Sequence, residues 1–361
     1  MFSHVLQSEF ELTLNPARIV FAEGAITRTQ EMVEALGCKR ALVLSTPGQI
    51  DQAQALVASV GASAIGSYSN ATMHTPVDVT TDALENFERL EADCTIAIGG
   101  GSTTGLGKAM SHRTGRPQIV IPTTYAGSEV TPILGQTENN MKTTIRDADL
   151  QPDIVIYDPE LSYGLSESMT ITSGLNAVAH AVEALYAKDR NPVSSLMALE
   201  GARAIFEALP DIKSKPDSTL GRRKALYGAW LCGSVLGLVG MALHHKLCHT
   251  LGGMFDLPHA QTHAVVLPHA LAFNEVAVPD SLSPIATMLN SQTAGAGLFE
   301  FTRSVGAPLA LKDLGMPESG IASAAQSAVQ NSYWNPRDFN QEQIERIIDN
   351  AYHGRSPEAL A

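Results

Sequence analysis

The sequence has no apolar run long enough to cross a membrane. The longest, from Gly228 to Leu243, is interrupted by Ser234 and four glycines and falls short of the ~20 residues that a spanning helix needs. We therefore expect a buried core helix there. The N-terminal segment MFSHVLQSEFELTLNP has no basic stretch followed by an apolar one, so no signal peptide is expected. Together these features predict a cytoplasmic protein without membrane contact.

Positive charge is also scarce. The chain has 24 Lys and Arg against 37 Asp and Glu, a net charge of -13, which argues against nucleic acid or an anionic membrane as a partner. Its four cysteines form no C-x-x-C pair, so we expect buried free thiols in a reducing compartment.

The pattern of apolar residues divides the 361 residues into two parts. Up to Pro159, short β-branched runs at 41–45, 94–99, 118–122 and 153–158 alternate with amphipathic helical segments, which predicts a parallel sheet covered by helices. Beyond Pro159 the chain is rich in Ala and Leu with helical periodicity. We expect an α/β domain over residues 1–159 and an all-α domain over residues 160–361.

Neither the G-x-G-x-x-G fingerprint nor a Walker A motif is present, yet residues 96–110 read as a strand, a glycine turn and a helix start. Glycines such as Gly100 and Gly101 let the backbone approach a phosphate, and the N-terminus of the helix that follows offers free N–H groups beside Ser102. The segment predicts a phosphate site, and a tight turn without a ligand is the alternative.

Two further strand ends support a nucleotide site. One carries the hydroxyls of Thr123, Thr124 and Ser128, and the other reads Ser45-Thr46. In an open α/β sheet these ends share the edge at which ligands bind. Because Ser45 stands where a carboxylate would exclude a 2′-phosphate, we expect NADPH to be accepted beside NADH.

Histidine is concentrated in one stretch, since five of the eleven histidines lie between His244 and His263. His245 and His249 have helical i,i+4 spacing, as do Asn176 and His180 in an amphipathic segment over 172–187. With His259, these positions provide potential ligands from three places. Histidines satisfied within the core are the alternative interpretation.

Together these motifs resemble the iron-containing (group III) alcohol dehydrogenase family. The resemblance rests on GGGS, GSEVTP, G-x-N-A-x-x-H and H-x-x-x-H…PH, in order along nearly the whole chain. It implies a Rossmann-like dinucleotide-binding domain followed by an all-α catalytic domain, as in dehydroquinate synthase. Within the family, PTTYAGSEVTP and HHKLCHTLGG resemble the branch that reduces maleylacetate, a small dicarboxylate. A homodimer is implied as well.

The chain departs from the family pattern at the presumed metal site. Asn176 replaces the Asp that supplies a charged oxygen to the metal in metal-binding members, whereas His180, His245 and His259 are present. An amide oxygen is a poorer ligand for Fe²⁺ or Zn²⁺ than a carboxylate. We therefore expect that no metal is required; if one is bound, these four residues are its expected ligands.

The resemblance also implies roles for single residues. His249 corresponds to the position beside the nicotinamide, while Asn176, His180, His245 and His259 would line the substrate end, where protonated imidazoles donate a proton and stabilise negative charge. Contacts to a dicarboxylate would come from four nearby candidates: His244, Lys246, Arg337 and Tyr125. Lys246 and Arg337 are equally consistent with solvated surface charges. Further cofactor contacts are expected from Thr75 and Lys142.

Three alternatives remain open at this level. A metal-dependent alcohol or aldehyde reductase would lose activity to chelators. A lyase resembling dehydroquinate synthase would consume no NAD(P)H overall. A non-catalytic nucleotide-binding module would bind NADH without turnover, although the histidine set argues against it.

Overall fold

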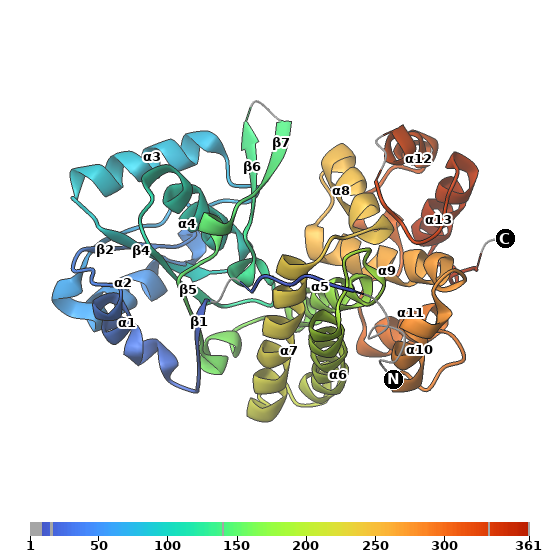
Figure 1. Cartoon of the computed structure of the whole chain (residues 1–361), viewed down its shortest axis with the longest axis horizontal. Coiled ribbons are helices and arrows are strands. Elements are labelled where there is room, and N and C mark those ends of the chain that lie inside the picture. Colours follow the sequence, from blue (N-terminus) through green and yellow to red (C-terminus); the bar gives the residue numbers. More distant parts are fainter. Residues whose placement is uncertain (1–8, 15–16, 139–140, 331–332, 360–361) are drawn as a thin grey trace. The chain divides into compact units, whose positions relative to one another are not determined.

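The computed structural model describes residues 9–14, 17–138, 141–330 and 333–359 and divides into two units (Figure 1). One unit runs from Thr13 to Leu165, and the other comprises Ser166 to Ala361 together with the N-terminal residues up to Leu12. The expected boundary at Pro159 lies within the first unit, at the start of the 3-10 turn Pro159–Ser162.

The first unit contains a six-stranded parallel sheet with the order β1-β8-β5-β4-β2-β3. Its strands are β1 (Arg18–Phe21), β2 (Ala41–Leu44), β3 (Ala64–Tyr68), β4 (Cys94–Gly99), β5 (Gln118–Pro122) and β8 (Ile154–Tyr157). The four strands expected from the sequence are present, and β1 and β3 are added at the two edges. Because the strands are parallel, the carboxyl ends of β2, β4 and β5 lie at one edge of the sheet. The strand order reverses between β2 and β4, and open α/β sheets bind ligands beside such a reversal.

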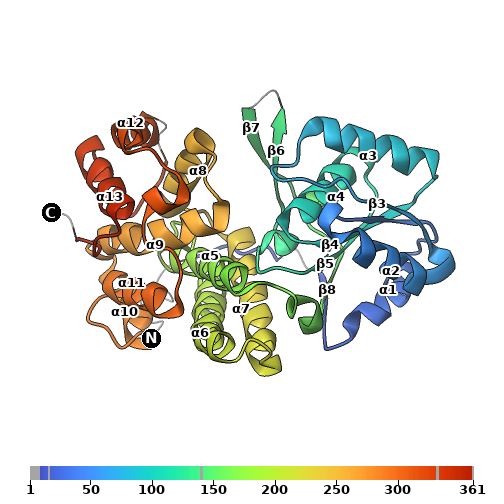
Figure 2. The ribbon, with the colours of Figure 1, turned by 180° about the vertical axis from the view of Figure 1, so that it is seen from behind.

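Helices cover both faces of this sheet, because successive strand residues point to opposite sides. Ala41 and Val43 pack with α1 (Thr29–Ala35) and α2 (Ile50–Val60). Leu42 and Leu44 pack with α3 (Val77–Arg89) and α4 (Gly101–Thr114). Figure 2 shows the same layers from behind. A hairpin of β6 (Ile133–Glu138) and β7 (Met141–Arg146) follows β5 and was not expected from the sequence.

The second unit is helical. Its helices are α5 (Glu167–Tyr186), α6 (Pro192–Ser214), α7 (Thr219–Leu238), α8 (Leu243–Phe255), α9 (His259–Glu275), α10 (Pro279–Met288), α11 (Ala294–Val305), α12 (Ile321–Gln330) and α13 (Gln341–His353). Helix α5 packs against α6, α7 and α9. Apolar residues of α8, α9, α12 and α13 form one core, which places the histidine-bearing helices on a rigid support.

The prediction of a single core helix over residues 228–243 is wrong. Helix α7 ends at Leu238, and α8 begins at Leu243 after a bend of 95°. The break is stabilised by side chains from elsewhere, since the Asp189 carboxylate accepts the N–H of Gly240 at 2.9 Å and Glu183 accepts the N–H of Ala242 at 3.0 Å. N–H groups in the segment that leads into α8 are thereby satisfied.

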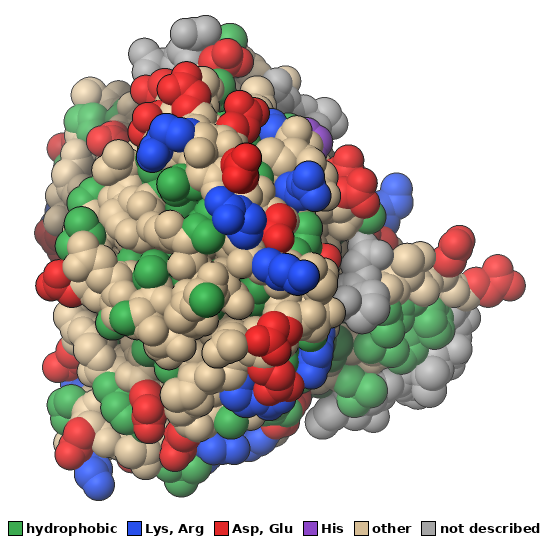
Figure 3. Space-filling view, turned by 90° about the vertical axis from the view of Figure 1, so that its left-hand side faces the viewer, with side chains coloured by type: hydrophobic (Ala, Val, Ile, Leu, Met, Phe, Trp, Pro, Cys, Tyr) green, Lys and Arg blue, Asp and Glu red, His purple; other side chains and the backbone are tan. Residues whose placement is uncertain are grey.

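Among the described residues, no single helix has the length and apolar character to span a membrane; only the bent pair α7 and α8 meets that test, by length and composition alone. Figure 3 views the molecule from the side on which Figure 1 labels α1, α2 and α3. On the described part of this face, acidic, basic and hydrophobic side chains are mixed and no extended area carries one sign of charge.

Candidate active site

The glycine turn after β4 has the geometry of a phosphate-binding loop. Gly99 has φ 151°, and Gly100 precedes the first residue of α4. The loop is fixed to the next strand end, because the N–H of Thr123 donates to the carbonyl of Gly99 at 2.9 Å. The exposed Gly101 and the half-buried Ser102 begin the helix, so its unpaired N–H groups and positive dipole end lie at the ligand-binding edge of the sheet.

Side chains from three strand ends are connected at this edge. Gln49 donates from Nε2 to Thr123 Oγ1 at 3.2 Å, and Thr46 donates from Oγ1 to Gln49 Oε1 at 3.1 Å. Ser45 differs from expectation, because it is fully buried and its hydroxyl bonds to that of Ser69 at 2.9 Å. Ser45 therefore connects the ends of β2 and β3, and its hydroxyl is not presented to a ribose.

The remaining expected cofactor residues have different surroundings. Thr75 is buried in a left-handed conformation with φ 47°, and its carbonyl accepts the N–H of Thr137 at 3.3 Å. Thr124 and Ser128 are half-buried in the turn after β5. The backbone of Lys142 pairs with Thr137 in the hairpin, and its side chain lies outside the part that the structure describes.

Lys108 is a feature of this site that sequence reasoning missed. Its ammonium group is fully buried in α4 and donates to the carbonyls of Ser128, Thr131 and Ile133 at 2.5, 2.6 and 2.9 Å, and to Thr131 Oγ1 at 2.9 Å. Burial lowers the pKa of Lys108 to about 7. Lys108 thus ties the phosphate-binding helix to the turn after β5. The sign of this role in the sequence was a lysine among the apolar and small residues of GLGKAM.

Replacing Gly100 with valine tests the phosphate loop. A Cβ at this position would lie 3.1 Å from both Cγ2 and Oγ1 of Thr124, and it would stand where the backbone must approach the pyrophosphate. We expect the Michaelis constant for NAD(P)H to rise by at least about tenfold. A tenfold rise corresponds to the loss of roughly one charge-assisted hydrogen bond to the pyrophosphate. Gly164→Val is the matched control, because a Cβ there meets nothing within 4 Å. Unchanged cofactor affinity in folded Gly100→Val protein would remove the phosphate assignment.

The helical unit gathers six histidines from three helices. Helix α5 contributes His180, α8 contributes His244, His245 and His249, and α9 contributes His259 and His263. Ring centroids are 5.2 Å apart for His180 and His245, 6.2 Å for His245 and His249, and 6.4 Å for His249 and His259. The histidines that the spacing singled out therefore lie in one cluster, with Asn176 one turn before His180 on α5.

Glu183 organises this cluster, and its helical spacing places it on the same side of α5 as Asn176 and His180. Its carboxylate is fully buried and accepts the N–H of His244 at 2.9 Å and that of Ala242 at 3.0 Å, which caps α8. It also lies 2.7 Å from Nδ1 of His245. A carboxylate only accepts hydrogen bonds, so Nδ1 carries the proton and Nε2 of His245 presents a lone pair.

Several polar atoms of the cluster are buried without a hydrogen-bond partner: Asn176 Oδ1, His180 Nδ1, His245 Nε2 and both ring nitrogens of His263. Burial and the neighbouring imidazoles hold the pKa values of His180, His245 and His263 well below the usual range. These surroundings favour the neutral form of all three rings, whereas the expectation from the sequence was that His180 and His245 donate protons as imidazolium ions. His249 and His259 are exposed.

Three of the four expected substrate contacts, His244, Arg337 and Tyr125, are fully buried or hydrogen-bonded within the protein. His244 is fully buried and lies 3.1 Å from the carbonyl of His263 through Nε2, so it supports the cluster from behind. Arg337 donates to the carbonyl of Phe273 at 2.8 Å and stacks on its ring. Lys246 is half-buried with its ammonium 5.4 Å from the Tyr333 ring centroid. Tyr125 is fully buried in the nucleotide unit.

Comparison with known proteins identifies the family. Residues 16–159 match the family model of iron-containing alcohol dehydrogenase, and residues 170–352 match that of the C-terminal part of the Fe-containing alcohol dehydrogenase family. The chain therefore belongs to the iron-containing alcohol dehydrogenase family, whose members are NAD(P)-dependent oxidoreductases. The resemblance and the fold expected from the sequence are both confirmed.

Relatives at high identity share one name. The maleylacetate reductase of Rhizobium sp. (strain MTP-10005) is 55% identical over 97% of this chain and 99% of its own length. That of Burkholderia cepacia is 52% identical over 94% of this chain and 97% of its own. The crystal structure of maleylacetate reductase from Agrobacterium tumefaciens superposes with a TM-score of 0.95 at 54% identity, covering 97% of this chain and 100% of that chain.

Proposed function

We propose that the chain reduces the carbon–carbon double bond of maleylacetate with NADH or NADPH, giving 3-oxoadipate in the breakdown of aromatic compounds. The observation that carries this proposal is the 55% identity to a maleylacetate reductase across 97% of the chain. The histidine cluster supports it, because the reaction needs groups that bind an anionic oxygen and supply a proton.

The reaction adds one hydride and one proton. The hydride leaves the reduced nicotinamide and bonds to the alkene carbon distant from the ketone, while the alkene electrons move toward the ketone and form an enolate oxygen. A proton then bonds to the carbon beside the ketone. One NAD(P)H and one proton are consumed for each 3-oxoadipate formed. The protein must therefore position the nicotinamide, stabilise the enolate and deliver a proton.

Different residues serve these needs. The N-terminus of α4 and the turn after β5 bind the cofactor pyrophosphate. Since His180 and His245 are buried and His259 is an expected metal ligand, proton delivery falls to the exposed His249. Lys246 supplies positive charge for the dicarboxylate.

The cluster also fits a divalent metal, as the family name implies. Asn176 Oδ1, His180 Nδ1 and His245 Nε2 are buried donors without partners, and Glu183 orients His245 as outer carboxylates orient metal-binding histidines. Three neutral imidazoles are a sufficient ligand set for Zn²⁺. Asn176 alone is thus no ground for expecting that no metal is required. A bound metal would polarise the ketone oxygen of the substrate.

Oxidation of NADH at 340 nm with maleylacetate tests the function directly. We expect turnover with maleylacetate and with either reduced cofactor, and little with simple aldehydes. The same assay with a strong chelator distinguishes this function from the second candidate, a metal-dependent alcohol or aldehyde reductase. The buried polar atoms without partners, which could bind a metal, favour that candidate. Turnover of aldehydes but not of maleylacetate, abolished by chelation, would replace the proposal with that candidate. Light scattering tests the homodimer that the family resemblance implies.

A further inference from the structure

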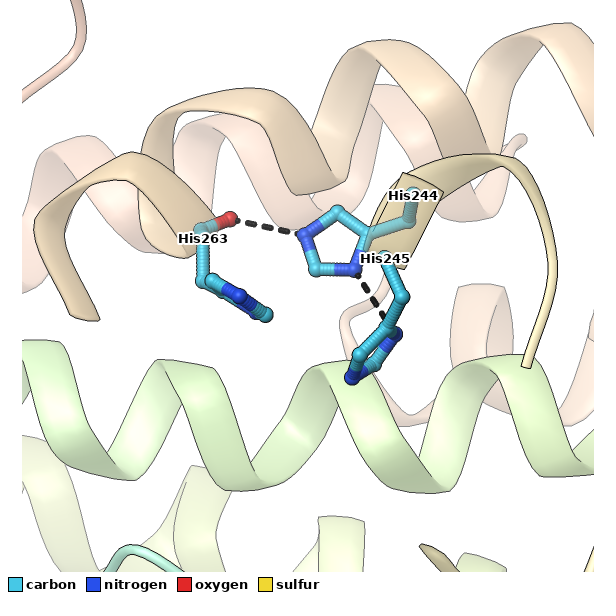
Figure 4. A group of neighbouring side chains, drawn as sticks. All are labelled: His244, His245 and His263. Carbon is cyan, nitrogen blue, oxygen red and sulfur yellow. Dashed lines mark hydrogen bonds between the residues drawn. The ribbon is translucent and has the colours of Figure 1, made fainter. Parts of the chain in front are cut away.

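A second group of metal-ligating side chains lies in the nucleotide unit. Among the described residues, two sets of three His, Cys, Asp or Glu side chains have ligand atoms that all lie within 4.8 Å of one another. Figure 4 shows the first set, which belongs to the histidine cluster described above. The other set is Cys38, Asp93 and Cys94, which have no part in the proposed reaction.

These three side chains meet at the amino edge of the parallel sheet. Cys38 follows the end of α1, Asp93 directly precedes β4, and Cys94 is the first residue of β4. The proposed pyrophosphate site lies at the carboxyl ends of the strands, which form the opposite edge of the same sheet. A ligand held by this group would therefore join the segment between α1 and β2 to β4 without contacting the cofactor.

The Asp93 carboxylate is held in place by the backbone. Its Oδ2 accepts the N–H of Lys39 at 2.8 Å, and its Oδ1 accepts the N–H of Arg40 at 2.9 Å. Each oxygen of an ionised carboxylate can accept more than one bond, so both oxygens retain a lone pair. Asp93 is half-buried, which keeps the group in contact with solvent.

The two thiols are buried, since Cys38 is 7% exposed and Cys94 is 0% exposed. The Cys38 thiol has only long contacts to two backbone carbonyls, at 3.7 and 3.8 Å. Burial raises the pKa of both thiols, and the charge of Asp93 raises both pKa values as well. Asp153 also raises the pKa of Cys38, whereas Arg116 lowers it. Both thiols are therefore protonated at neutral pH, and a metal that binds them must displace two protons.

The spacing of the ligand atoms fits tetrahedral coordination. Zn–S bonds are about 2.3 Å long and Zn–O bonds about 2.0–2.2 Å, so donor atoms on one tetrahedral ion lie about 3.6–3.8 Å apart. Because the ligand atoms here already lie within 4.8 Å of one another, movements of about 1 Å bring them to that separation. Soft thiolate ligands select Zn²⁺ and similar ions over Mg²⁺ and Ca²⁺.

We propose that Cys38, Asp93 and Cys94 bind a thiophilic divalent cation such as Zn²⁺. Two metal–sulfur bonds and one metal–oxygen bond form, both S–H bonds break, and the two protons pass to solvent. A water molecule takes the fourth position, as in other zinc sites with three protein ligands. The ion binds the folded chain only, because the three ligands converge there, and it therefore stabilises the nucleotide unit by mass action.

Titration with Cd²⁺ alone, in the presence of a thiol-free reductant, tests this site. Cadmium–thiolate bonds give an ultraviolet charge-transfer band that cadmium–imidazole bonds do not give. We expect one Cd²⁺ per chain to produce the band and to release two protons, so affinity should rise by about 100-fold for each unit of pH. Cys38→Ser and Cys94→Ser should each weaken binding by at least about 100-fold, since loss of an outer partner of a metal ligand already costs about 10–100-fold.

Cys232→Ser is the matched control, because Cys232 is a fully buried cysteine of α7 that belongs to neither set. Cys248→Ser measures any contribution of the histidine cluster, since Cys248 Sγ lies 3.4 Å from Nε2 of His244. Both variants should retain the band.

Three results would overturn the proposal: a wild-type protein without the band, release of fewer than two protons, or a band that Cys38→Ser retains and Cys248→Ser loses. Proton release is measured on the wild-type protein and decides the matter even where a cysteine variant does not fold. None of these results bears on maleylacetate reduction, which the NADH assay measures separately.

Discussion

Glu183→Ala is expected to destabilise the helical unit by about 3–5 kcal/mol, as measured by urea unfolding. The fully buried carboxylate accepts the N–H groups of Ala242 and His244 and the Nδ1 proton of His245, and Tyr186 donates to it at 3.3 Å. Alanine would leave these donors unpaired in the core and would remove the cap of α8. Each unpaired donor costs about 1–3 kcal/mol.

Glu183→Gln separates stability from site geometry. An amide keeps one acceptor oxygen but presents N–H groups to neighbours that are themselves donors. We expect a smaller loss of stability than with alanine and a 10–100-fold loss of metal affinity, because His245 is no longer held with its Nε2 lone pair presented. Glu200→Gln is the control, since its ion pair with Arg203 is on the surface and contributes about 1 kcal/mol or less. If Glu183→Gln and Glu200→Gln show equal stability and metal content, Glu183 does not organise the site.

Asn176→Asp should have two large and opposite effects. Asn176 is 4% exposed with its Oδ1 unpartnered, so an isosteric carboxylate would add a charged ligand beside His180. We expect affinity for Fe²⁺ or Zn²⁺ to rise by at least about tenfold, which is 1.4 kcal/mol, because an anion interacts more strongly with a cation than a dipole does. The rate of maleylacetate reduction should fall, since the added charge repels a dianionic substrate.

Metal content, by elemental analysis, and kcat/KM are measured for this variant and for wild type. The control is Gln54→Glu, which adds the same charge on the exposed face of α2. Unaltered metal affinity in Asn176→Asp would show that position 176 lies outside the metal site.

The sequence predicted best those elements whose signal is local. Strands β4 and β5 appear within the expected ranges because each is a continuous buried apolar run. The edge strands β1 and β3 were missed, since they are only partly buried and so lack a continuous apolar run. The break between α7 and α8 could not be predicted, because it depends on carboxylates from residues more than fifty positions earlier in the chain.

The same division holds within the site. Helical spacing was enough to group Asn176, His180 and Glu183 on one side of a helix and to pair His245 with His249. The contacts of Glu183 with α8 and those of Lys108 with the turn after β5 depend on how these elements pack in three dimensions. Glu183 and Lys108 have a role because their charged groups are buried away from water and bond to other parts of the protein. Burial is a property of the folded chain and is not visible in the sequence.

The Lys108 ammonium group has a consequence for the thermodynamics of cofactor association. Four hydrogen bonds hold the residues from Ser128 to Ile133 in place before any nucleotide arrives. A loop that is already ordered loses little conformational entropy on binding, whereas ordering a free residue costs about 1–2 kcal/mol. The N–H of Thr131, which donates to the carbonyl of Ser128 at 3.2 Å, should therefore exchange slowly with deuterium in the free protein, and its protection should change little when NADH binds.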